Sequence, residues 1–173
     1  MLKNLLIYKM IILNACGLTV LAWAWQRGFV ADMFLNDKSY MTYVAMVLFM
    51  AGIASCGGRA IKVSRMLNGV KEGEKSKFNA VKIIEKAAHL DDIGNLIVTV
   101  GLTGTAIGVV MMLHSFNAGS LTDPDKVVET ATMLGDGVGT AFRSTIVSAI
   151  AWMWLIPNLR MLKTATVMMI EDS

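Results

Sequence analysis

The sequence is poor in charge, in proline and in cysteine. Of its 173 residues 17% are charged, and it holds two prolines and two cysteines. Soluble domains carry about 25% charged residues, so this scarcity argues against an ordinary soluble fold. Cys16 and Cys56 both fall inside apolar segments. That placement argues against a disulfide framework or a metal site, and we expect both to be small packing residues.

Long apolar segments take the place of the missing charge. Hydrophobic residues make up 55% of the chain, and the mean hydropathy is +0.57. At about 1.5 Å rise per residue, four segments are long enough to span or nearly span a hydrocarbon core of about 30 Å. These segments are residues 5–25, 40–56, 93–116 and 137–157. We therefore expect an all-α integral membrane protein, one domain over residues 1–173, whose first helix is retained rather than cleaved as a signal peptide.

The distribution of basic residues predicts how the helices are oriented. Lysine and arginine crowd the segment 57–92 and follow the fourth apolar segment, whereas the connections 26–39 and 117–136 hold few of them. Under the positive-inside rule, both termini are then cytoplasmic. The segment 57–92 alternates apolar and charged residues as a helix does, so we expect a helical cytoplasmic insertion. It is either a docking site for a soluble partner or a solvated hairpin whose lysines touch anionic lipid.

The third apolar segment lies in a stretch, Ile93 to Thr122, that carries no formal charge. A projection at about 100° per residue places small residues within one arc of this helix, with Thr99 and Thr103 on the other side. The arc consists of Gly94, Gly101, Gly104, Thr105 and Gly108. Small residues in membrane helices let another backbone approach closely. This face is therefore predicted to be a close helix contact that carries one hydroxyl.

The fourth apolar segment has a matching face. The same projection groups Gly137, Ala141, Ser144, Thr145 and Ser148. The two faces either pack against each other as an antiparallel hairpin, with each threonine bonded to its own i−4 carbonyl, or line a narrow, weakly polar pathway or helix-binding groove. In the second case Thr105, Thr145, Ser144 and Ser148 would hold water or an ion.

The chemistry of an enzyme is absent from the pattern. We find no nucleophile–base pair, no metal-ligand spacing and no phosphate-binding loop, so we expect neither catalysis nor a cofactor. No nucleic-acid partner is expected either. The bilayer itself is the first partner that the composition implies.

Two motifs resemble those of a known family. Residues 101–108, GLTGTAIG, look like the G-L-x-G-T-x-x-G motif of the MotA/TolQ/ExbB family of ion-driven motor subunits. Residues 137–151, GVGTAFRSTIVSAIA, are similar to that family's second motif, and Pro157 resembles the proline that closes it. Thr140 departs from the glutamate that many TolQ/ExbB relatives have there. The four-helix layout resembles the flagellar stator branch more than the three-helix branch.

The resemblance implies a function and partners. It implies a bacterial inner-membrane protein that forms a homopentamer around a single-pass partner of the MotB/TolR/ExbD type, with protons or sodium crossing past an aspartate of that partner. Thr105 and Thr145 match the family's pore-facing threonines. The third and fourth apolar segments contain no Asp or Glu, which fits a subunit whose partner supplies the titrating carboxylate. A holin-like pore-former or a membrane scaffold subunit would also explain the small-residue packing.

Arg143 is the unusual charge in the fourth apolar segment. It projects about 160° away from Thr145, so we expect it to face away from the proposed pathway. An arginine within a membrane helix is costly unless it reaches the interface or a counter-charge. We expect Arg143 to extend to the external interface or to pair with Asp136, Asp123 or a neighbouring subunit.

Overall fold

The protein is all-helical in a computed structural model that describes residues 5–68, 73–115 and 124–171. Side chains are described for residues 6–65, 89–114 and 126–167. Its helices are α1 (Leu5–Gln26), α2 (Phe29–Leu35), α3 (Met41–Asn68), α4 (Gly73–Ser115) and α5 (Pro124–Glu171). All but α2 are long and apolar enough to cross a membrane, over Leu6–Gln26, Met41–Arg65, His89–His114 and Lys126–Val167. The expected all-helical class with four long apolar helices is confirmed.

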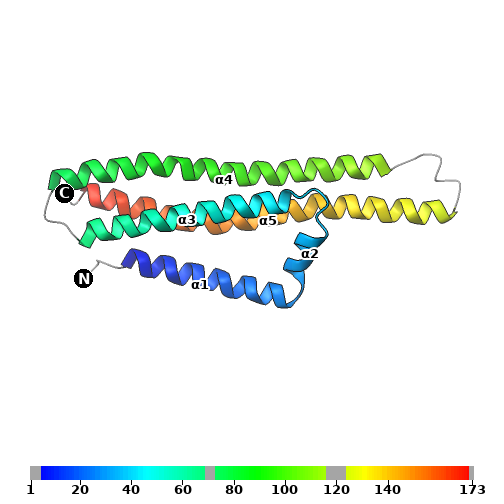
Figure 1. Cartoon of the computed structure of the whole chain (residues 1–173), viewed down its shortest axis with the longest axis horizontal. Helices are drawn as coiled ribbons and strands as arrows, with labels where there is room; N and C mark the ends of the chain where they lie inside the picture. The colour runs from blue at the N-terminus through cyan, green and yellow to red at the C-terminus, as the bar shows by residue number, and fades with distance from the viewer. Residues whose placement is uncertain (1–4, 69–72, 116–123, 172–173) are drawn as a thin grey trace.

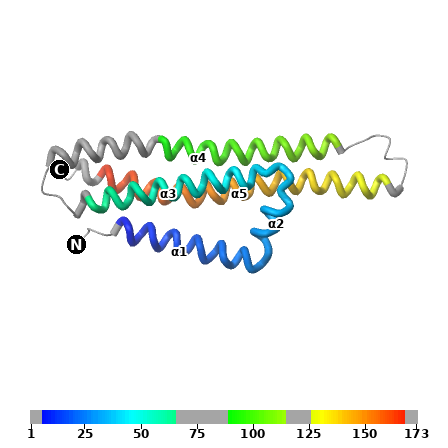
Figure 2. Tube along the Cα trace, viewed as in Figure 1, coloured from blue at the N-terminus to red at the C-terminus, as the bar shows by residue number. Residues whose placement is uncertain are grey.

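The helices form an elongated bundle around one long hairpin. Figure 1 shows α4 and α5 running antiparallel along the whole length of the molecule, with α3 packed against both. The first helix lies at the edge, and α2 turns the chain from α1 back to α3 (Figure 2). The start of α1 and the end of α5 lie at the same end of the bundle, which we call the terminal end. The end of α4 and the start of α5 lie at the opposite end.

Three helices extend beyond the apolar segments that defined them in the sequence. The segment 40–56 is the first part of α3, and 93–116 is the last part of α4, so most of the expected helical insertion 57–92 belongs to these two helices. The fourth segment was expected over 137–157, but α5 begins at Pro124 and continues through Pro157 to Glu171. Proline fits the first turn of a helix, where its missing N–H is not needed. Inside a membrane helix, neighbouring groups satisfy the carbonyl that proline leaves unbonded.

The short helix α2 was not expected within the connection 26–39. Gly28 adopts φ 80°, a left-handed conformation that favours glycine, and thereby separates α1 from α2. Asp37 then prepares the start of α3, because its carboxylate accepts hydrogen bonds from the backbone N–H groups of Ser39 (2.9 Å) and Thr42 (2.8 Å). Such acceptors satisfy the free N–H groups of a helix start.

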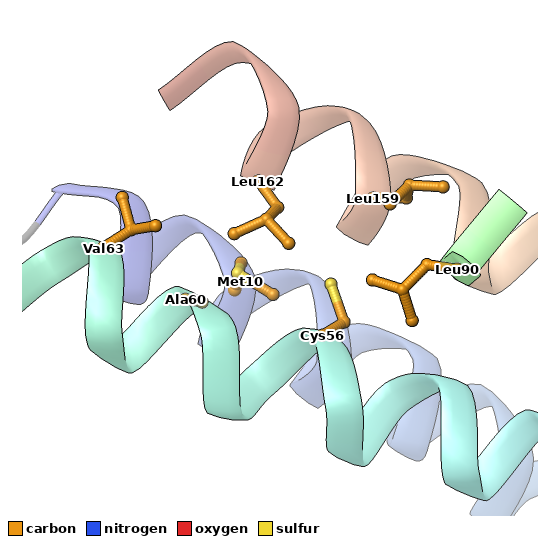
Figure 3. Packing of buried hydrophobic residues seen from close by; sticks show 7 residues of the cluster. All are labelled: Met10, Cys56, Ala60, Val63, Leu90, Leu159 and Leu162. Atoms are coloured by element: carbon orange, nitrogen blue, oxygen red, sulfur yellow. The ribbon is translucent and has the colours of Figure 1, made fainter. Parts of the chain in front are cut away.

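The buried apolar core lies along α3, α4 and α5. At the terminal end, one cluster joins all four long helices and contains Met10, Cys56, Ala60, Val63, Leu90, Leu159 and Leu162 (Figure 3). A second cluster toward the middle contains Phe49, Ile97, Ala151 and Leu155. Cys56 is a buried packing residue as expected, whereas Cys16 is exposed; both are free.

The first helix contributes little to this core. Within its membrane span 6% of residues are buried, against 22–33% for the other three spans. An apolar groove of about 730 Å³ separates it from α3 and α5. Asn14 forms its main polar attachment: its amide donates to Asn158 Oδ1 of α5 (2.9 Å), and its own oxygen accepts from the indole of Trp154 (2.9 Å).

Candidate functional site: the α4–α5 seam

Small residues hold α4 and α5 in close contact along a line that we call the seam. Three glycines of α4 meet three small residues of α5, in the pairs Gly101 with Ser148, Gly104 with Ser144, and Gly108 with Ala141. At Gly108 a side-chain carbon would lie 2.5 Å from the backbone nitrogen of Ala141, so the two backbones nearly touch. Gly137 meets the backbone of Met112 in the same way, at 2.8 Å. The predicted small-residue faces therefore pack against each other.

The two serines of the seam lie inside this packing. Ser144 is 0% exposed and Ser148 is 2% exposed. The hydroxyl of Ser144 donates to the carbonyl of Ala141 (3.2 Å), whereas Ser148 Oγ has no hydrogen-bond partner among the described residues. Within a single chain, these serines face the neighbouring helix rather than an open surface.

The two threonines lie together at one edge of the seam. Their hydroxyls are in direct contact. Thr105 Oγ1 lies 3.1 Å from its own i−4 carbonyl, Gly101 O, and 3.3 Å from Ala141 O on the other helix. Thr145 Oγ1 mirrors this arrangement, at 3.1 Å from Ala141 O and 3.3 Å from Gly101 O. Each threonine therefore bonds back along its own helix, as the packing interpretation requires, and also crosses the seam.

This hydroxyl pair remains half-buried rather than enclosed. On α4, the residues about one helical turn to either side of Thr105 are exposed: Leu102 (62%) and Val109 (41%). A hydroxyl has one proton to donate but two lone pairs with which to accept. Two hydroxyls together can therefore keep their internal bonds and still present oxygen lone pairs to a cation or a water on the open side of the seam.

An ion pair crosses the same seam near the terminal end. Lys163 Nζ of α5 lies 2.5 Å from Asp91 Oδ2 of α4, and the two side chains are 41% and 44% exposed. Between this pair and the threonines, the ring of Trp152 packs on Gly94. The threonine pair and the ion pair each form side-chain hydrogen bonds between α4 and α5.

Comparison with known proteins supplies the family. A profile of the MotA/TolQ/ExbB proton channel family matches residues 62–172, which include all of α4 and α5. The chain belongs to this family. No curated protein and no solved structure matches it significantly. Its relatives are channels and not enzymes, and family membership implies a stator or channel subunit of an ion-driven complex. The family pairs with partners of the MotB/TolR/ExbD type.

In this member of the MotA/TolQ/ExbB family, Arg143 has a partner that the sequence did not suggest. Its Nε lies 3.3 Å from Asp32 Oδ2 of α2, and its Nη1 donates to the carbonyl of Asn36 (3.4 Å). Asp136 pairs with Lys38 instead (2.7 Å), and Asp123 lies outside the described residues. Arg143 faces α2 and not the threonine pair, as the projection predicted.

The carboxylates of Asp32 in α2 and of Asp37 just after it are held in their charged form. A hydrogen bond from Asn36 lowers the pKa of Asp32 most, and Arg143 lowers it further. Burial raises the pKa of Asp37, but hydrogen bonds from Ser39 and Thr42 outweigh that effect, so its pKa lies below the ordinary value. The charge of Asp32 ties α2 to Arg143 of α5, and the charge of Asp37 accepts hydrogen bonds at the start of α3.

Sequence reasoning missed the amide cluster of Asn14 and Asn158. Both are uncharged polar residues inside otherwise apolar spans, and amides there commonly hydrogen-bond across helices. That signal was present, but it did not identify the partner, which lies on a helix 144 positions away. Most lysines of the segment 57–92 lie outside the described side chains, so the docking interpretation of that segment stays a prediction.

Proposed function

We propose that this chain forms the ion channel of a motor complex in the bacterial inner membrane, as a homopentamer around a single-pass partner that brings a membrane aspartate. The terminal end of the bundle is cytoplasmic in this proposal, because α3 ends and α4 begins there, within the segment 57–92 that is rich in lysine and arginine, and α5 runs toward it after Pro157. Protons or sodium would pass along the open side of the seam, between the α4–α5 hairpin and the partner helix.

One observation carries the proposal: Thr105 and Thr145 meet on the open side of a seam that is otherwise lined by glycine, alanine and buried serine. Neither α4 after Asp92 nor α5 between Asp136 and Glu171 contains a carboxylate. A proton relay within a membrane normally uses an ionisable group. Paired hydroxyls without a carboxylate therefore fit a channel wall whose titrating group comes from another chain.

The buried serines have a supporting part in this proposal. Ser144 and Ser148 would keep α4 and α5 close, together with Gly101, Gly104, Gly108, Gly137 and Ala141. The hydroxyl of Ser148, which has no partner among the described residues, would become an ion ligand only if the helices separate. In this proposal the ion route therefore runs along the two threonines.

Replacement of both threonines tests the route. Thr105→Val with Thr145→Val removes both hydroxyls and preserves side-chain shape. A hydrogen bond to a charged group contributes about 1.5–3 kcal/mol, so we expect proton or sodium flux to fall by about tenfold or more. Flux is measured in proteoliposomes that contain the complex copurified with the tagged chain, and assembly is measured by the mass of the detergent-extracted particle.

A matched control lies on the same helix. Thr99 and Thr103 are exposed and bond to their own i−4 carbonyls, at 2.8 and 2.9 Å. Thr99→Val with Thr103→Val should leave flux and particle mass unchanged. Full flux in the Thr105/Thr145 double variant would contradict the route, and a monomeric or dimeric wild-type particle would contradict the motor function.

A further inference from the structure

The ion pair Asp91–Lys163 shares the open face of the seam with the two threonines. Lys163 follows Thr145 by 18 residues, about five helical turns, so the two side chains leave α5 on the same side. Asp91 precedes Thr105 by 14 residues, which places it within about 40° of that threonine on α4. One face of the hairpin thus carries a hydroxyl pair in the membrane and an ion pair nearer the terminal end.

Charge along this face is one-sided among the described side chains. From the threonines toward the terminal end, the face leads past Trp152 to the charged pair. In the other direction, Val109, Met112 and Val138 are apolar, and Thr130 is polar but uncharged. The described charged ligands of this face therefore lie on the side that we assigned to the cytoplasm.

We propose that Asp91 and Lys163 form the cytoplasmic gate of the ion route, an inference that rests on the proposed function. A cation that leaves the threonines toward the terminal end would next be bound by the carboxylate of Asp91, which lies on the same face. In the structure Lys163 holds that carboxylate, at 2.5 Å, and excludes a second cation from it. An ion passes when Lys163 releases Asp91, and the gate closes again when the pair reforms.

The half-exposed position of the pair suits such a gate. Fully buried pairs separate at high cost, because each charge is then left without solvent. At 41% and 44% exposure, neither side chain is enclosed by the protein, so a separated charge is not left in a closed interior. Lysine also has a flexible stem and a compact charge, which lets it leave and return without disturbing the helices.

Removal of each charge separately tests the gate, because the two variants should act in opposite directions. Lys163→Gln frees Asp91 and opens the exit, so passive proton or sodium leak should rise by about tenfold. Asp91→Asn leaves an unpaired lysine that repels cations, so the leak and the driven flux should both fall by about tenfold. The double variant should return close to the wild-type value. A proton-sensitive dye and a sodium-sensitive dye, trapped in proteoliposomes that contain the copurified complex, report both ions.

A neighbouring charge provides the control. Asp92 is exposed, projects about 140° away from Thr105 on α4, and lies 3.7 Å from His89 instead. Asp92→Asn should leave flux unchanged. A purely structural ion pair would make Lys163→Gln and Asp91→Asn change flux in the same direction, and that result would overturn the gate. A wild-type complex that conducts neither ion would instead contradict the proposed function.

Discussion

The α4–α5 hairpin and the first helix represent two ways of packing helices in one chain. Along the seam, glycines bring the backbones into contact, and at Gly108 even one additional carbon would meet the backbone of Ala141 at 2.5 Å. The first helix instead leaves an apolar groove of about 730 Å³ beside it and is attached through the side chain of Asn14. The hairpin is a tightly fitted unit, whereas α1 is attached at a few points.

The contrast between the hairpin and α1 coincides with the extent of the family match. The matched residues 62–172 contain the hairpin, and α1 and α2 lie outside them. Close contact between backbones leaves no space for a larger residue, so the seam has few alternatives in sequence. The first helix has mostly unburied side chains and joins the core through Met10, so most of its positions accept many apolar side chains. In the proposed function, the hairpin is the part that sets the geometry of the channel wall.

The largest loss of stability and of ion flux is expected when a single methyl group is added in the seam. Gly108→Ala places a carbon against the backbone of Ala141, so α4 and α5 must separate. Overpacking of this kind costs about 1–3 kcal/mol. We expect that loss in the free energy of unfolding, measured by denaturation of the purified protein in mild detergent, together with a loss of ion flux.

The same substitution in α3 serves as control. Gly58 is exposed and has no atom within 4 Å of the position where a side-chain carbon would lie. Gly58→Ala should leave stability unchanged or slightly raised, since alanine is the better helix former. Equal losses in the two variants would show that the seam is no tighter than the rest of the bundle.

A smaller effect is expected from the attachment of α1. Asn158 is fully buried, and its replacement leaves the amide N–H of Asn14 without its acceptor on α5. We expect Asn158→Leu to lower the free energy of unfolding by about 1 kcal/mol, while ion flux is largely retained. Asn95→Leu is the control, because Asn95 is exposed on α4. A complete loss of flux in Asn158→Leu would contradict the peripheral role of α1.

The smallest loss of stability is expected when the ion pair between α2 and α5 is removed. Arg143→Gln removes a partly exposed ion pair with Asp32, so at pH 7 it should cost about 0.5 kcal/mol. The pKa of Asp32 lies below its ordinary 3.8, so this carboxylate stabilises the fold above that pH and loses its contribution as the pH falls through the lowered value. The difference between wild type and variant should therefore shrink in strong acid.

Melting temperatures at pH 7 and at an acidic pH below the lowered pKa of Asp32 measure this difference. Arg160→Gln on the same helix should show no pH-dependent change, because Arg160 is exposed and has no part in the α2 network. A constant difference between wild type and Arg143→Gln at both pH values would mean that the carbonyl of Asn36, and not Asp32, is the partner that stabilises Arg143.

Much of the site was predictable because it depends on helical periodicity. The arcs that contain Thr105 and Thr145 follow from spacing alone, and the structure places these two hydroxyls in contact. The partner of Arg143 was not predictable, because Asp32 lies 111 positions away on a seven-residue helix that begins after a left-handed glycine. The burial of Ser144 and Ser148 was not predicted either. Helical periodicity shows which residues share a face, but not how closely each of them packs against the neighbouring helix.

The sequence by itself determined the four long apolar helices, the small-residue faces of α4 and α5, and the lack of a carboxylate in their apolar spans. Each is a property of one continuous segment, fixed by hydropathy and by the repeat of about 3.6 residues. The tertiary structure decided which edge of the seam stays open, that Lys163 pairs with Asp91, and that Asn14 of α1 hydrogen-bonds to α5. Those contacts depend on how packed helices are rotated and shifted against one another, and no single segment encodes that arrangement.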